Sequence, residues 1–186
     1  MENRITIATP RYSAHFDHNT VVAGLTRTYG QRGIAVKSEP ALPGGKKADL
    51  ALRFNDGWTY IEVKTRNEKR SRNRNISFRQ GILRELMRLG AHSLKQLPRK
   101  ESSLVVLSTS PSPDRREAIS KITIARSFRW RIFKEKNDRV IGVMIFAPFR
   151  SPKKSPTGWR YASTLIPNPN WDNPKGRFEK LMSVQL

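Results

Sequence analysis

The sequence predicts an α/β protein in which helices flank a mixed β-sheet. Three observations predict this class. Two long stretches carry apolar residues at helical spacing, one segment alternates apolar and polar residues on both sides of a tight turn, and two short apolar runs have the composition of buried strands. Because these patterns follow one another along 186 residues, we expect both kinds of element to share one core.

The first part of the chain predicts one helix followed by a three-stranded meander. Residues 17–31 repeat apolar residues on one helical face and end at glycines. The stretch 34–42 is extended, and Pro43-Gly44-Gly45 predicts a turn. Residues 48–54 alternate as a strand, and 58–65 form the return strand of a hairpin.

The second part of the chain predicts two more helices and two buried strands. After a polar, basic loop over 66–75, residues 77–97 have the clearest helical periodicity. The apolar runs 103–109 and 140–147 predict strands, with a short helix over 113–121 between them.

The sequence divides into a main domain over 1–147 and a basic, proline-rich extension over 148–186. Six of the twelve prolines lie between Pro148 and Pro174. Because proline interrupts strand and helix hydrogen bonding, we expect this extension to be irregular and to pack on the domain.

Composition limits the possible functions. The chain has 36 Lys and Arg against 15 Asp and Glu, a net charge of +21, which predicts a polyanionic partner such as nucleic acid. It has no cysteine, so disulfides and thiolate metal sites are excluded. No membrane span or signal peptide is recognisable, and we expect a cytoplasmic, non-secreted protein that does not bind membranes.

The hairpin carries the residues with the most specific chemistry. If Asp56-Gly57 forms the turn, Asp49 lies opposite Lys64, and Glu62 is its diagonal neighbour. Alternation along the strands then places Asp49, Glu62 and Lys64 on one face. Two close carboxylates favour a cation between them, and their oxygens suit Mg²⁺. A bound metal activates water, and a lysine stabilises charge developing on phosphate, so these groups indicate phosphodiester hydrolysis.

Asp49 followed after twelve residues by Glu62-Val63-Lys64 on a hairpin resembles the motif of the PD-(D/E)xK nuclease superfamily. The order of elements over residues 15–110 is similar to the core of that group, although Ala48 replaces its usual proline. The resemblance implies a restriction-endonuclease-like fold and an endonuclease that cuts DNA, often as a homodimer. It also implies Mg²⁺, or Mn²⁺ as a substitute, bound by Asp49, Glu62 and the main-chain carbonyl of Val63.

Three further residues have a less specific signal. Enzymes of the resembled group often carry another acid upstream, and both Glu39 and Asp17 are candidates. We favour Glu39 because it ends a strand next to the hairpin, whereas Asp17 has the position of a helix N-cap. Gln80 matches the glutamine of RecB-like nucleases, and it equally matches a capping box that begins at Ser77.

Basic residues around this motif predict the path of the nucleic acid. Between Lys64 and Lys100 the chain has twelve Lys and Arg against two Glu. A run this one-sided beside a metal site indicates phosphate contacts. The residues expected to bind nucleic acid are Lys46, Lys47, Arg66, Lys69, Arg70, Arg72, Arg74 and Arg79. The three histidines have no metal-site spacing, and we expect surface or capping roles for them.

Two other functions fit the same composition. A nucleic-acid-binding module on a nuclease-like scaffold would keep the charge without needing Asp49, Glu62 and Lys64 together. An RNA-binding component of a ribonucleoprotein would need the charge alone. The presence of all three motif residues favours the nuclease.

Overall fold

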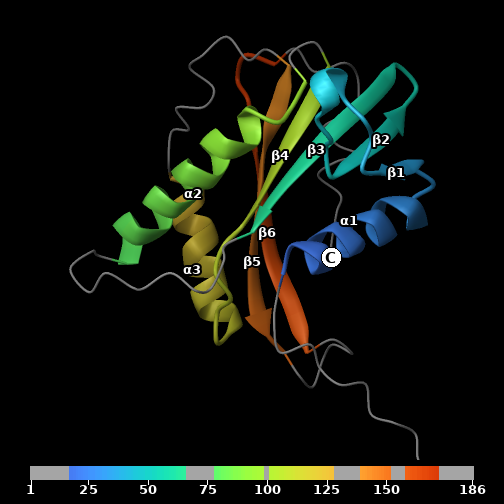
Figure 1. The fold of residues 1–186 in the computed structure, drawn as a ribbon. Helices are drawn as coiled ribbons and strands as arrows, with labels where there is room; N and C mark the ends of the chain where they lie inside the picture. Colours follow the sequence, from blue (N-terminus) through green and yellow to red (C-terminus); the bar gives the residue numbers. More distant parts are fainter. Residues whose placement is uncertain (1–16, 66–77, 99–100, 128–138, 152–157, 172–186) are drawn as a thin grey trace, which may run out of the picture.

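The computed structural model describes residues 17–65, 78–98, 101–127, 139–151 and 158–171, which form a six-stranded mixed sheet with helices on both faces (Figure 1). This arrangement confirms the predicted fold class. The elements are α1 (His18–Gln31), β1 (Val36–Ser38), η1 (Pro43–Gly45), β2 (Leu50–Phe54), β3 (Gly57–Thr65), α2 (Phe78–Leu94), β4 (Ser102–Ser108), α3 (Arg115–Arg126), β5 (Val140–Arg150) and β6 (Trp159–Pro167).

The strands lie in the sheet in chain order, β1-β2-β3-β4-β5-β6. The two outer pairs at the start, β1/β2 and β2/β3, are antiparallel, as is β5/β6 at the other edge. The central pairs β3/β4 and β4/β5 are parallel. The carboxyl ends of β3, β4 and β5 therefore lie at one edge of the sheet, where α/β proteins commonly place ligands.

Helix α1 covers one face of the sheet (Figure 1). Asp17 caps it by accepting a hydrogen bond from the Thr20 backbone N–H at 2.9 Å, and such a cap satisfies a donor that the first helical turn leaves open. Its buried side, Val21, Leu25 and Tyr29, packs against apolar side chains of the sheet. This packing fixes the first turn of α1 relative to the hairpin.

Helices α2 and α3 cover the opposite face, where a second apolar cluster lies (Figure 1). Ile82, Leu86 and Leu89 of α2 contribute one turn after another, as the helical periodicity predicted. Helix α3 adds Ala118, Ile122 and Ala125 to the same cluster, and it extends beyond the 113–121 stretch expected from the sequence.

The prediction of an irregular extension from residue 148 is wrong for residues 148–151 and 158–167, which the structure describes. β5 crosses the expected boundary and continues to Arg150, and Trp159–Pro167 forms β6 at the edge of the sheet. The one proline of β6, Pro167, is tolerated because it is the last residue of an edge strand, where a missing N–H costs little. Among the described residues, no helix is long and apolar enough to cross a membrane.

Candidate functional site

The pairing between the two strands of the hairpin differs from the prediction by two positions. Phe54 pairs with Gly57 and Leu50 with Ile61, so Asn55 and Asp56 form the turn rather than Asp56 and Gly57. Asp49 therefore does not lie opposite Lys64, as expected from the sequence. A shift of two positions preserves the alternation of faces, so Glu62 and Lys64 stay on the face expected for them.

Asp49 lies just before β2, where the regular ladder ends. Its backbone N–H donates to the Ile61 carbonyl at 3.1 Å. Its side-chain Oδ2 accepts the Val63 backbone N–H at 2.6 Å, in place of a main-chain acceptor. Asp49 is therefore bonded to the residues on both sides of Glu62, and its carboxylate is held next to that of Glu62.

Glu62 is a buried carboxylate whose surroundings oppose its charge. Its side chain is 2% exposed, and Oε1 forms an ion pair with Lys64 Nζ. Burial raises the pKa of Glu62, with a further increase from the nearby Asp49 charge, and the hydrogen bond from Lys64 offsets part of it. Oε2 is buried without a hydrogen-bond partner among the described residues.

His18 joins this group, although it was not among the site residues predicted from the sequence. His18 is the first residue of α1, and its Nε2 lies 3.1 Å from Asp49 Oδ1. The hydrogen bond to Asp49 raises the pKa of His18, more than burial lowers it. The expectation of a mere surface or capping role is therefore wrong for His18. Its position directly after the Asp17 helix cap was the available signal.

The favoured upstream acid, Glu39, does not join this group. Its side chain is 72% exposed and pairs with Lys47 at 3.2 Å. Its backbone N–H donates to the Asp49 carbonyl, but a positive φ of 44° turns the chain at Glu39 out of the strand. Asp17 is the N-cap of α1, as the alternative interpretation of this residue predicted. Gln80 lies exposed in the first turn of α2, and its role stays a prediction.

Three of the predicted nucleic-acid-binding residues lie in the described chain. Lys46 Nζ donates to the Lys95 carbonyl at 2.7 Å, Lys47 pairs with Glu39, and Arg79 contacts Ser127 Oγ at 3.5 Å. All three are exposed. The others lie outside the described residues: Arg66, Lys69, Arg70, Arg72 and Arg74.

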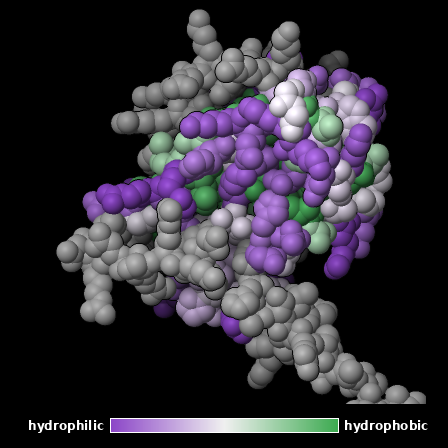
Figure 2. Space-filling model, viewed as in Figure 1, coloured by the Kyte–Doolittle hydropathy of each residue, from purple (hydrophilic) through white to green (hydrophobic). Residues whose placement is uncertain are grey.

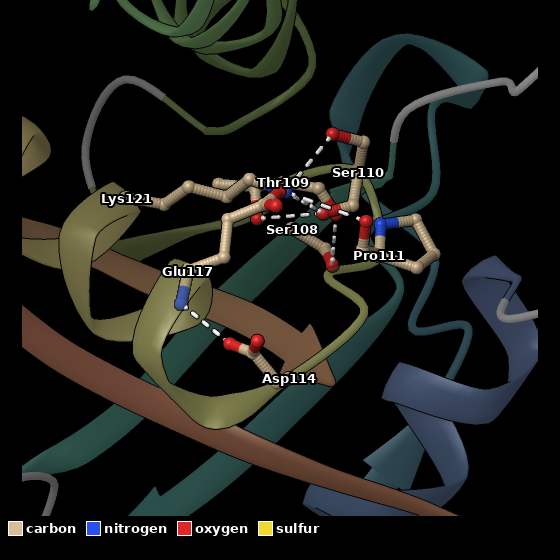
Figure 3. Close-up of polar contacts among 7 residues, drawn as sticks. All are labelled: Ser108, Thr109, Ser110, Pro111, Asp114, Glu117 and Lys121. Carbon is tan, nitrogen blue, oxygen red and sulfur yellow. Dashed lines mark hydrogen bonds and ion pairs between the residues drawn. The ribbon is translucent and has the colours of Figure 1, made fainter. Parts of the chain in front are cut away.

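A second polar cluster lies just beyond β4, at the same edge of the sheet as the end of β3 (Figure 3). Lys121 of α3 is buried, and its Nζ reaches the Ser110 carbonyl at 2.9 Å, the Pro111 carbonyl at 3.3 Å and Glu117 Oε1 at 2.9 Å. These acceptors use the hydrogen-bonding capacity of the ammonium group. Lys121 therefore fastens the loop after β4 onto α3.

The group around Glu62 fits a hard divalent cation. The described residues contain no set of three or more His, Asp or Glu side chains arranged to hold a metal. Mg²⁺ does not require such a set, because it binds through one or two carboxylates together with water and substrate phosphates. Asp49 and Glu62 could supply these two carboxylates, since Oε2 of Glu62 has no hydrogen-bond partner among the described residues.

Comparisons with known proteins identify no family for this chain. No family model matches the sequence, and no curated protein matches it. One similar solved structure is SfsA from Pyrococcus furiosus in a complex with Ca²⁺, at 12% identity and a TM-score of 0.33. The match covers 79% of this chain and 58% of that chain, so this chain spans less than two thirds of SfsA.

Proposed function

We propose that this protein is a Mg²⁺-dependent nuclease that hydrolyses phosphodiester bonds of DNA as an endonuclease. The observation that carries the proposal is the buried Glu62 carboxylate, which keeps one oxygen without a partner among the described residues and lies beside Asp49 and Lys64. Without a cation, this arrangement leaves a buried acceptor unsatisfied, which costs about 1–3 kcal/mol. A metal ion would remove that cost.

Each residue of the group has a distinct role in the proposed reaction. Asp49 and Glu62 would hold the metal, and the carbonyl of Val63 is a further candidate ligand. When bound, the metal would lower the pKa of a water and neutralise charge on the phosphate. Lys64, which is 26% exposed on its side chain, would orient the attacking water and stabilise the developing negative charge. His18 would position Asp49 through its hydrogen bond.

The substrate class follows from charge. A net charge of +21 attracts polyanions, and exposed Lys46, Lys47 and Arg79 belong to the basic residues expected to contact phosphate. Hydrolysis of DNA rather than RNA, and cutting within a strand rather than from an end, rest on the sequence motif. Mn²⁺ is expected to substitute for Mg²⁺, because both accept oxygen ligands.

The direct test is to incubate the protein with supercoiled plasmid, branched DNA and RNA, each with Mg²⁺ and with EDTA. We expect nicking of DNA with Mg²⁺ and none with EDTA. Tight binding of DNA with no cleavage under either condition would instead support a non-catalytic binding module. Preferential binding of RNA without cleavage would support a ribonucleoprotein component.

A further inference from the structure

The solvent side of α2 carries an unusual set of charges. The exposed positions of this helix recur every three to four residues and include Arg84 and Arg88, with Lys95 just after the last turn. None of these exposed positions is acidic. Glu85, the acid of this helix, is half-buried on its flank. In the space-filling view, the part of this face that is not grey is largely hydrophilic (Figure 2).

This pattern is unfavourable for a helix that faces only water. Solvated helices usually alternate charges of opposite sign, and like charges at i and i+4 destabilise a helix by about 0.2–0.5 kcal/mol per pair. Arg84 and Arg88 form such a pair. Lys95 has a local explanation at the helix C-terminus, where a cation is favourable, but Arg84 lies in the middle of the helix.

Two contacts extend this surface beyond α2. The hydrogen bond from Lys46 Nζ to the Lys95 carbonyl fastens the segment that leads to Asp49 onto the end of α2. At the other end, the contact between Arg79 and Ser127 joins α2 to α3, next to the exposed Arg126. The basic residues of three segments therefore lie on a connected surface, and one of those segments leads directly to the proposed site.

We infer that the solvent face of α2 binds the phosphate backbone of duplex DNA at some distance from the cleavage site. The α2 surface is defined by Arg84, Arg88 and Lys95, with Lys46 at its end. It extends the basic run between Lys64 and Lys100 to a defined surface, because Arg84, Arg88 and Lys95 are not among the eight residues individually expected to bind nucleic acid. The inference rests on the proposed substrate but not on the proposed catalysis.

The spacing of these cations suits a DNA strand. At about 1.5 Å per helical residue, Arg84 and Arg88 lie roughly 6 Å apart along α2, and Arg84 and Lys95 roughly 16 Å apart. Successive nucleotides of one strand rise about 3.4 Å along the duplex axis. The three cations can therefore contact several phosphates of one backbone. Contacts of this kind add affinity and salt dependence without reading sequence.

The test compares two variants that lose the same charge. The α2 variant changes Arg84, Arg88 and Lys95 to Ala, and the control variant changes Arg27, Lys37 and Arg160 to Ala. All six residues are exposed, and the control residues lie on α1, β1 and β6. Binding to a 30-base-pair duplex is measured in EDTA across a range of salt concentrations, after circular dichroism has shown both variants to be folded.

We expect the plot of log binding constant against log salt concentration to become shallower by about two to three units in the α2 variant, at about 0.9 per lost phosphate contact. The control variant should keep the wild-type slope. Equal slopes for the two variants would overturn the inference. If the α2 variant lost binding to phosphatidylserine vesicles while its DNA binding stayed unchanged, the inference would also be overturned. The α2 surface would then be a membrane-binding surface. Because EDTA prevents metal-dependent cleavage, failure of the proposed nuclease activity would leave this result unaffected.

Discussion

At the scale of single residues, Glu62 is the position where stability and the proposed function conflict. Burial raises its pKa above the ordinary value of 4.5, so the folded protein holds this proton more tightly than the unfolded chain does. Without metal, its contribution to stability is therefore greatest below pH 4.5 and is lost as the pH rises through the raised pKa. The carboxylate that we propose to be catalytic is thus held at a cost to the fold.

The variant Glu62→Gln tests this conflict. We expect it to melt at a higher temperature than the wild type in EDTA near pH 8, by about 2–4 °C for each kcal/mol relieved. The difference should shrink toward pH 4, where Glu62 is protonated. Lys64 is partly exposed, so the loss of its charged partner should cost little.

Addition of Mg²⁺ provides the matching control. A ligand that binds only the folded state raises its stability, so Mg²⁺ should raise the melting temperature of the wild type more than that of Glu62→Gln. A variant that melts below the wild type near pH 8 in EDTA would show that the Glu62 charge stabilises the fold. That result would remove the argument for an unsatisfied carboxylate.

His18 is the residue whose role was found from the structure. Replacing a side chain that orients a metal ligand typically costs 10- to 100-fold in metal affinity or activity. We expect His18→Ala to slow plasmid nicking by about this factor and to shift the Mg²⁺ concentration needed for half-maximal rate upward. The matched control is His92→Ala, because His92 is an exposed histidine of α2. Equal rates for both variants would mean that the His18–Asp49 contact has no part in the reaction.

At the scale of elements, the first turn of α1 places His18 beside the hairpin. Asp17 and Asp114 cap α1 and α3 in the same way, each accepting a backbone N–H at 2.9 Å. Loss of such a cap costs about 1 kcal/mol. The two helices thus have equivalent caps, and only that of α1 lies next to the proposed site.

This equivalence gives a prediction from a matched pair. Asp17→Ala and Asp114→Ala should each lower the free energy of unfolding in urea by about 1 kcal/mol. Because fraying of α1 displaces His18, only Asp17→Ala should also slow nicking. Equal nicking by the two variants, with equal loss of stability, would show that the position of the α1 terminus does not affect the reaction.

The elements also show what the sequence could predict. The helices and the strands up to β5 follow hydrophobic periodicity, which depends on local spacing and which burial enforces. The strand β6 escaped prediction because its flanking prolines indicate irregular chain. Its ladder to β5 depends on pairing with the preceding strand, which residues 159–167 alone do not reveal.

The candidate site was likewise predictable where it depends on local alternation along a strand, and not where it depends on the tertiary structure. A strand places alternate residues on one face, so Glu62 and Lys64 could be assigned together even though the turn residues were wrong. The position of Glu39 was not predictable, because it depends on a positive φ and on a pairing with Lys47. The contact of His18 with Asp49 depends on how α1 packs across the sheet, which is a property of the tertiary structure.

At the scale of the whole molecule, a strongly cationic protein surrounds a small group of carboxylates. Its net charge of +21 favours the approach of DNA, whereas Asp49 and Glu62 repel phosphate unless a cation lies between them. Metal-free binding and metal-dependent cleavage should therefore respond differently to the same substitution. That difference separates a nuclease from a surface hairpin stabilised by ion pairs.

The most direct measurement is nicking of supercoiled plasmid with Mg²⁺, paired with DNA binding in EDTA, for the wild type, Asp49→Asn and Lys64→Ala. We predict that both variants lose at least about 100-fold in nicking rate, since Asp49 is the proposed metal ligand and Lys64 is proposed to stabilise charge on the phosphate. Asp49→Asn removes a negative charge and should bind DNA as tightly as the wild type or more tightly, whereas Lys64→Ala should bind equally or less tightly. Nicking by Asp49→Asn at the wild-type rate would contradict the central claim.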